Sequence, residues 1–299
     1  MLRPDYGAHE RLVAPARPGR AIWRLFIGLL IVAGVVFGLN SLLNAVIFAL
    51  TPEYWRVEIA AAETPGDAPL SMLIVLGSFG FAIVGVGLAA WLMQNRRPLG
   101  LVGPLPLALV QFWQVFRGLA LLGIVLFVLP PWDMGVPLER NLAFSHWLLL
   151  LPVSLVAVMI QTSAEEILFR GYIQQSLAAR FSSPLIWMIL PSVLFALGHY
   201  LPADAGENAV PIALWAGVFG CLMADLTARA GTLGPAIAVH FFNNIIALLL
   251  VSLPGALSGL SLYLVPFEMS ETEAMRAWLA VDFATMLVTW LAARLALRR

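Results

Sequence analysis

Two adjacent carboxylates stand at the polar end of a long apolar run. Glu165 and Glu166 follow the apolar segment that starts near Trp147, and Arg170 comes four residues after Glu166. An ionised carboxylate in hydrocarbon costs roughly 2.5–3.5 kcal/mol on membrane-insertion scales, so such groups are expected to be paired and functional. On a helix, the i,i+4 spacing lets Arg170 pair with Glu166 along one face. The plainer alternative is a structural ion pair beside a solvated Glu165.

Two further pairs of side chains recur at the same helical spacing in later apolar segments. Phe195 and His199 are four residues apart, and so are His240 and Asn244. Residues at this spacing share one helix face, so His240 and Asn244 could donate hydrogen bonds to one point, whereas Asn243 lies about 100° round the helix. Packing or interhelical hydrogen bonding is the structural alternative for each pair, and such bonds are common in membranes.

The combined set of side chains suits hydrolysis of an amide bond. A carboxylate and an imidazole can activate water, because one accepts its proton and the other orients it or relays the proton. A second imidazole and a carboxamide can donate hydrogen bonds to a developing oxyanion. Glu165, His199 and His240 could instead hold a catalytic Zn²⁺ with one open position. The His-Glu-x-x-His motif of common zinc proteases is absent, and the residues alone leave both mechanisms open.

The composition indicates an all-α, polytopic membrane protein. The chain has 299 residues, of which 61% are hydrophobic and 11% are charged. Soluble domains carry about 25% charged residues. The net charge of zero gives no support to a nucleic-acid partner, and the single Cys221 excludes a disulfide framework built within this chain. The expected partners are the lipid bilayer and a peptide or membrane-protein substrate.

Eight apolar segments approach the ~20 residues that a membrane span needs. They are Ile22–Leu50, Leu70–Met93, Leu107–Leu129, Trp147–Thr162, Leu185–Tyr200, Val210–Leu226, Leu233–Leu253 and Trp278–Leu297. We divide the chain into an N-terminal tail (1–20), N-terminal spans (21–145), a protease-like core (146–253), and an outer loop with the last span (254–299).

Arginine placement sets the expected orientation. Arginines concentrate before the first span, in alternate loops and at the C-terminus, while the other loops are mostly acidic. By the positive-inside rule, this pattern puts both termini in the cytoplasm, and we expect a bacterial plasma membrane. The same topology puts His199 near the outer end of the fifth span and Glu165 at the inner end of the fourth, which would hold them far apart.

The motif residues resemble the CAAX-protease and bacteriocin-processing family of intramembrane proteases, related to the type II CAAX prenyl endopeptidase. Glu165–Tyr172 matches the family's Glu-Glu-x-x-x-Arg motif, Phe195–His199 matches Phe-x-x-x-His, and His240–Asn244 matches His-x-x-x-Asn. The run Arg229–Leu233 is similar to the family's usual lead-in to the last motif. The match covers roughly residues 162–247, and the three motifs occur in order on three apolar segments.

The resemblance implies a helical membrane core whose site opens toward the cytoplasm. Carried over by position, Glu165 is the general base, His199 assists in activating water, and His240 with Asn244 forms the oxyanion pocket. Glu166 and Arg170 support the site. The family is often called metalloprotease, yet acid–base activation of water needs no tightly held metal, and we favour that mechanism. The resemblance also favours a deeply placed His199 over the position that the loops predict.

Two other classes of function remain open. A non-catalytic scaffold or immunity-type protein could bind a peptide or partner through the same polar cluster. A transporter could use paired intramembrane acids as a proton relay, but the sequence contains no recognisable inverted repeat.

Overall fold

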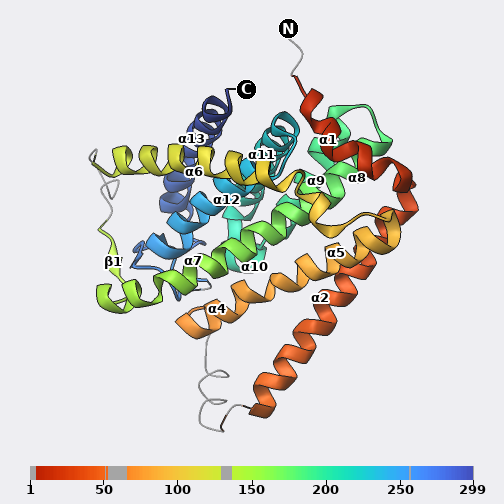
Figure 1. Ribbon diagram of the computed structural model, residues 1–299. Helices are drawn as coiled ribbons and strands as arrows, with labels where there is room; N and C mark the ends of the chain where they lie inside the picture. The colour runs from red at the N-terminus through yellow and green to blue at the C-terminus, as the bar shows by residue number, and fades with distance from the viewer. Residues whose placement is uncertain (1–4, 51, 53–65, 129–136, 256, 299) are drawn as a thin grey trace.

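The protein folds into a bundle of membrane-spanning helices (Figure 1). The computed structural model describes residues 5–50, 52, 66–128, 137–255 and 257–298. The predicted all-α polytopic class is confirmed. The expected end of the third span at Leu129 and the first four residues of the N-terminal segment lie outside the described residues.

Within the described residues, six helices are long and apolar enough to cross a membrane. They comprise α2 (Ile22–Leu50), α4 (Pro69–Ser78) with α5 (Gly80–Gln94), α6 (Leu105–Val128), α7 (Phe144–Glu166) with its continuations, α11 (Ala209–Ala230) with the short helices before it, and α13 (Thr272–Leu297). Two further apolar helices are shorter. They are α9 (Pro184–Gly198), and α12 (Gly234–Ile245) with its continuation η6 (Ile246–Leu250). Each of the eight expected segments therefore contains a helix, although the seventh ends in the strand Val251–Ser252, and two of the eight are too short to count as full spans by themselves.

The fourth segment continues well beyond its apolar part. From α7 the chain passes without a break through a π-helical segment, η4 (Ile167–Gln174), into α8 (Gln175–Arg180). The helix thus continues 14 residues past Glu166, to Arg180. π-Helical turns are rare and frequently mark functional sites. Here the π segment begins directly after Glu166 and contains Arg170.

The expected N-terminal tail is folded where it is described. It forms η1 (Gly7–His9), α1 (Glu10–Val13) and η2 (Ala14–Gly19), which pack against α11 and α8. Tyr6 donates a hydrogen bond to Asp225 on α11, with an O–O distance of 2.8 Å. Burial lowers the pKa of His9 to about 4, so its ring is neutral at pH 7 as it packs against Trp187. The segment therefore belongs to the folded core.

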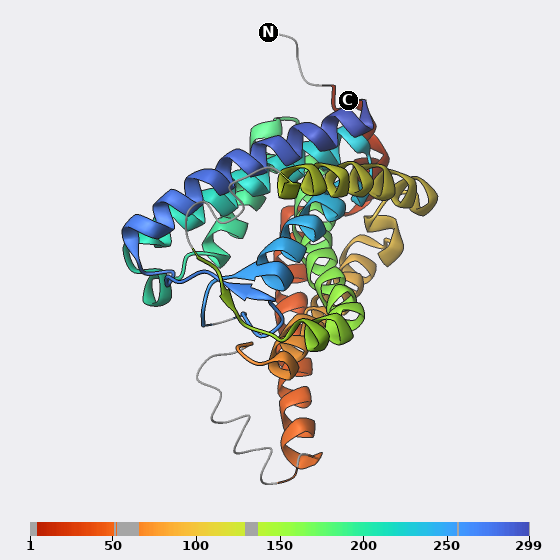
Figure 2. The ribbon, with the colours of Figure 1, turned by 90° about the vertical axis from the view of Figure 1, so that its left-hand side faces the viewer.

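Helix α12 lies at the centre of the bundle and contacts α6, α7, α11 and α13. Its first turns are buried on every side, from Gly234 to Phe241. A Cβ added at Gly234 would lie 2.1 Å from the carbonyl oxygen of Ala108 on α6, so only glycine permits this approach. In Figures 1 and 2, α6 runs across the bundle at a steep angle to α2. The crossing places α12 between α6 and α7.

Three two-residue strands form a small sheet in the order β1-β3-β2, made of β1 (Glu139–Arg140), β2 (Val251–Ser252) and β3 (Tyr263–Leu264). The sheet joins the segment before α7, which contains β1, to the segment after η6, which contains β2, and to the segment before α13, which contains β3. The indole of Trp147 on α7 adds a hydrogen bond to the carbonyl of Leu249, at 2.7 Å. The sheet thus fixes the start of α7 beside the end of η6, and the two helices run together toward the site.

The remaining short helices are α10 (Pro202–Ala205) and η5 (Gly206–Asn208), between α9 and α11, and η3 (Pro98–Leu101), before α6. The start of η1 and the end of α13 lie at the same end of the molecule (Figure 2).

Candidate active site

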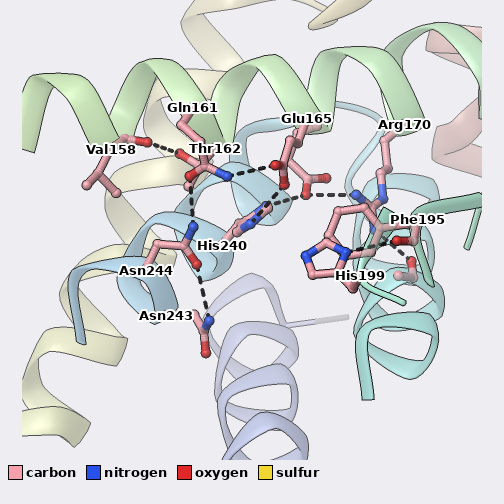
Figure 3. A network of polar contacts seen from close by, with 12 residues as sticks. Val158, Gln161, Thr162, Glu165, Arg170, Phe195, His199, His240, Asn243 and Asn244 are labelled. Atoms are coloured by element: carbon pink, nitrogen blue, oxygen red, sulfur yellow. Dashed lines mark hydrogen bonds and ion pairs between the residues drawn. The ribbon is translucent and has the colours of Figure 1, made fainter. Parts of the chain in front are cut away.

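The predicted polar residues meet where α7 passes into η4, beside α12 and the end of α9 (Figure 3). Glu165 and Glu166 close α7, and Arg170 follows in η4. His240 and Asn244 lie one turn apart on α12. Segments far apart in the sequence therefore converge on one polar network inside an apolar bundle.

The predicted ion pair between Glu166 and Arg170 is confirmed. Nη1 of Arg170 lies 2.9 Å from Oε1 of Glu166, and the two side chains are only 2% and 0% exposed. Nη2 of Arg170 donates a second hydrogen bond to the carbonyl of Gly220 on α11, at 3.2 Å. The guanidinium also lies over the ring of Phe195, 5.0 Å from its centroid. These contacts fix the buried charge of Glu166 in one orientation.

Helix α11 can supply that carbonyl because Gly220 allows α9 to pack closely. A Cβ at Gly220 would lie 2.9 Å from Ser192 on α9. Ala216 and Ala224, four residues before and after Gly220, are also buried, and small residues at this spacing permit close packing of membrane helices.

His240 links the two carboxylates. Its Nδ1 lies 2.8 Å from Oε1 of Glu166, and its Nε2 lies 3.5 Å from Oε2 of Glu165. The ring is buried against Phe219, 5.1 Å between centroids, and against Phe195, 6.1 Å between centroids. An ion-paired carboxylate has no proton to give, so Nδ1 must donate to Glu166. Nε2 then faces Oε2 of Glu165.

Gln161 completes the network and was not among the predicted site residues. Its Nε2 donates to Oε1 of Glu165 at 2.8 Å, while its Oε1 accepts from Nδ2 of Asn244 at 2.8 Å. Oδ1 of Asn244 accepts in turn from Asn243 at 3.3 Å. The only sequence signal for Gln161 is its position one turn before Glu165, since its bond to Asn244 crosses between two helices.

The two glutamates differ in accessibility. The side chain of Glu166 is 0% exposed, whereas that of Glu165 is 16% exposed. Oε2 of Glu165 is a buried atom without a hydrogen-bond partner among the described residues. A buried polar atom with no partner calls for an explanation, such as a water or ligand that completes it. Oε2 of Glu166 also lacks a partner among the described residues, so the exposure of the side chain distinguishes the two glutamates, and Glu165 is the carboxylate nearer to solvent.

His199 lies beside this network and is not hydrogen-bonded to it. It follows the last residue of α9, and its Nδ1 lies 2.9 Å from the carbonyl oxygen of Phe195. Its ring centroid lies 4.5 Å from that of Phe195, with the two ring planes tilted by 41°. Figure 3 shows the other ring nitrogen on the side that faces His240. The ring of Phe195 contacts both histidine rings, since its centroid also lies 6.1 Å from that of His240.

The short α9 explains why the loop-based separation of His199 from Glu165 does not hold. A helix of 15 residues is ~22 Å long at 1.5 Å per residue, less than the ~30 Å hydrocarbon core. Its end therefore stays within the bundle instead of reaching the far surface.

The three candidate zinc ligands do not form a metal site in this arrangement. Glu165 and His240 lie 3.5 Å apart, whereas His199 makes no hydrogen bond or ion pair with either of them among the described residues. No group of three or more His, Cys, Asp or Glu side chains in the described ranges is disposed to hold a metal ion.

Comparisons with known proteins agree with the motif resemblance. Residues 146–246 match the profile of the family described as type II CAAX prenyl endopeptidase Rce1-like, and this range contains every site residue named above. The chain is also similar to the uncharacterized protein YyaK of Bacillus subtilis (strain 168), with 26% identity over 261 residues, 83% of this chain and 84% of that protein. The search of solved structures gave no significant match. The family match supports an intramembrane protease of the CAAX type.

Proposed function

We propose that this chain, whose residues 146–246 belong to the Rce1-like family of CAAX-type proteases, is an intramembrane endopeptidase that hydrolyses a peptide bond with water. One observation supports it above the others: the unpartnered Oε2 of Glu165, 3.5 Å from Nε2 of His240. A carboxylate with a free oxygen beside an imidazole is the arrangement that general-base activation of water requires. Cleavage of peptide by purified wild type and Glu165→Gln protein tests the proposal.

The charges in the network favour a protonated His240. Two carboxylates and one guanidinium leave one negative charge, and buried charges are stable only when they are compensated. An imidazolium at His240 brings the sum to zero, because it donates from Nδ1 to Glu166 and presents Nε2–H beside Glu165. Arg170 and Glu166 thus hold His240 in the orientation that the reaction uses.

The reaction then proceeds through a tetrahedral intermediate. Oε2 of Glu165 takes a proton from a water molecule, and the water oxygen forms a bond to the carbonyl carbon of the substrate. The negative charge passes to the carbonyl oxygen, which accepts hydrogen bonds from Nε2–H of His240 and Nδ2–H of Asn244. Glu165 returns its proton to the leaving nitrogen as the C–N bond breaks. His199 orients the water from the side opposite Glu165.

Asn244 is expected to matter through its amide protons. Nδ2 has two protons, and one of them is donated to Gln161, so the other is free for the oxyanion. Asn244→Ala should lower kcat by about 10²–10³-fold, the usual loss for one oxyanion-hole donor. The measurement is kcat for a verified peptide substrate, with Asn243→Ala as the matched control. An unchanged kcat in Asn244→Ala would move the oxyanion site elsewhere.

Gln161 is expected to act as a positioning residue. It contacts Glu165 and Asn244 and reaches the substrate only through them. Gln161→Ala should lower kcat by about 10-fold, on the scale of one net hydrogen bond of ~1.4 kcal/mol, and leave KM unchanged. Because both single changes disturb the same unit, Gln161→Ala and Asn244→Ala should be less than additive in kcat. Full additivity would show that Gln161 acts independently of Asn244.

We also propose that the reaction requires no metal ion, since the donor set does not form a three-ligand site. Detergent-purified wild type protein with peptidase activity is expected to carry no stoichiometric zinc in metal analysis. About one zinc per chain, lost in both Glu165→Gln and His199→Ala, would instead identify these residues as ligands.

The proposed setting is the plasma membrane of a bacterium, with both termini in the cytoplasm. The start of η1 and the end of α13 lie at the same end of the molecule, as this topology requires. The substrate is a peptide or membrane protein, and nothing in the site selects for or against a prenyl group. A non-catalytic scaffold is the second candidate, because a buried polar network could equally bind a peptide backbone; that function would survive Glu165→Gln in cells.

A further inference from the structure

A basic cavity lies away from the active site, where η2 and the start of α2 meet the end of α8. Its volume is about 440 Å³, and its lining contains four arginines: Arg17, Arg20, Arg24 and Arg180. The rest of the lining is small or apolar and includes Trp23. Figure 1 shows the first turns of α2 beside α8, and the two helices are in contact.

The positive charge in this cavity is only partly compensated. Arg17 forms an ion pair with Glu10, and Arg24 donates a hydrogen bond to the carbonyl of Met93 at 2.9 Å. The side chains of Arg20 and Arg180 make no hydrogen bond or ion pair with any residue in the part of the chain that the structure describes. Two guanidinium groups on different elements therefore face one cavity without a counter-charge.

An apolar surface continues from the cavity along α2. Trp23, Phe26, Leu30 and Phe37 are 56%, 62%, 67% and 77% exposed. At 100° per residue these four side chains fall on one face of the helix. Exposed apolar surface of this length is suited to acyl chains, and it begins at the depth of Trp23, a residue type enriched at membrane interfaces.

We propose that this cavity binds the anionic headgroup of a phospholipid, whose acyl chains lie along the exposed face of α2. The free guanidiniums supply charge for a phosphate, and the adjoining apolar face explains why the ligand is a lipid and not a soluble phosphate ester. Basic pockets between membrane helices on the cytoplasmic side bind anionic headgroups in this way. The site is built from the folded N-terminal segment, and Gly19 of η2 packs so closely on Gln94 of α5 that a Cβ would lie 2.9 Å away.

The test is lipid binding by the detergent-purified full chain, measured by native mass spectrometry. The protein is titrated with phosphatidylglycerol, with phosphatidylcholine of the same acyl chains, and with glycerol phosphate. Wild type should bind phosphatidylglycerol preferentially. Each arginine near an anionic headgroup contributes about fivefold in affinity, so Arg20→Gln/Arg180→Gln should weaken phosphatidylglycerol binding by about 30-fold.

Two matched variants keep the result interpretable. Arg298→Gln removes the same charge from an exposed position outside the cavity and should bind as wild type does. Arg20→Lys/Arg180→Lys keeps both charges and should retain most of the affinity, which separates loss of charge from misfolding. Equal binding of the two lipids, wild type affinity in the double glutamine variant, or glycerol phosphate bound as tightly as phosphatidylglycerol would each overturn the proposal.

Discussion

Replacing Glu165 with glutamine is expected to lower peptide hydrolysis by about 10²–10⁴-fold, the contribution of a positioned general base. Glutamine keeps the shape of the side chain and can still accept the hydrogen bond from Gln161, but it cannot take a proton from water. The unpartnered Oε2 becomes an amide nitrogen or an oxygen of low basicity. The measurement is the initial rate of cleavage of a verified substrate by reconstituted protein, together with the thermal midpoint of unfolding.

A matched control for this variant is Glu207→Gln. The carboxylate of Glu207 is 79% exposed and pairs loosely with Arg276 at 3.7 Å, so its removal should change neither the rate nor the midpoint. If Glu165→Gln cleaves at the wild type rate, Glu165 is not the base. If it retains a cellular function that wild type performs without cleaving anything, the scaffold alternative holds.

Replacing Arg170 with methionine is expected to produce the largest loss of stability in the chain. Glu166 would then lose the guanidinium at 0% exposure and keep only His240 beside it, so one negative charge of the network would be uncompensated, and removing one partner of a buried pair typically costs about 3–5 kcal/mol. The carbonyl of Gly220 would also lose its donor. The thermal midpoint in detergent should fall sharply, and activity should fall with it, because His240 would no longer be held by a fixed Glu166.

A second variant separates the lost charge from the lost volume. Glu166→Gln/Arg170→Met removes both charges and should recover much of the midpoint, because no uncompensated charge remains. The control is Arg229→Met, which breaks another i,i+4 pair of similar length, 2.8 Å, but leaves Asp225 with donors from Tyr6 and Trp290. Equal losses in Arg170→Met and Arg229→Met would contradict the argument from burial.

What the sequence predicts well here is local. The ion pair between Glu166 and Arg170 and that between Asp225 and Arg229 both follow from i,i+4 spacing on a helix, and both are present. The helical class follows from apolar runs too long and too uncharged for a soluble core. The three motifs also identify the helices that converge on the site, because each motif lies on its own apolar segment.

What the sequence could not predict depends on contacts between elements. Gln161 is an ordinary polar residue in its own helix and gains its place only through Asn244, 83 residues later. His199 sits near the network because α9 is short, whereas counting residues between loops assumed a full span. The polar sequence of the N-terminal segment predicts a tail. In the structure, Tyr6 donates a hydrogen bond to Asp225 on α11, and His9 packs against Trp187 on α9. The composition of a segment does not indicate which distant residues it will contact.

The most direct test of the central claim is peptide cleavage in water enriched in ¹⁸O. Wild type and Glu165→Gln protein, reconstituted in liposomes, are incubated with prenylated and unprenylated CAAX peptides and with a bacterial membrane-protein extract. New C-termini are then identified by mass spectrometry. The account predicts new C-termini that carry ¹⁸O in the wild type sample and are absent with Glu165→Gln. New C-termini that appear equally in both samples, or in neither, would contradict it.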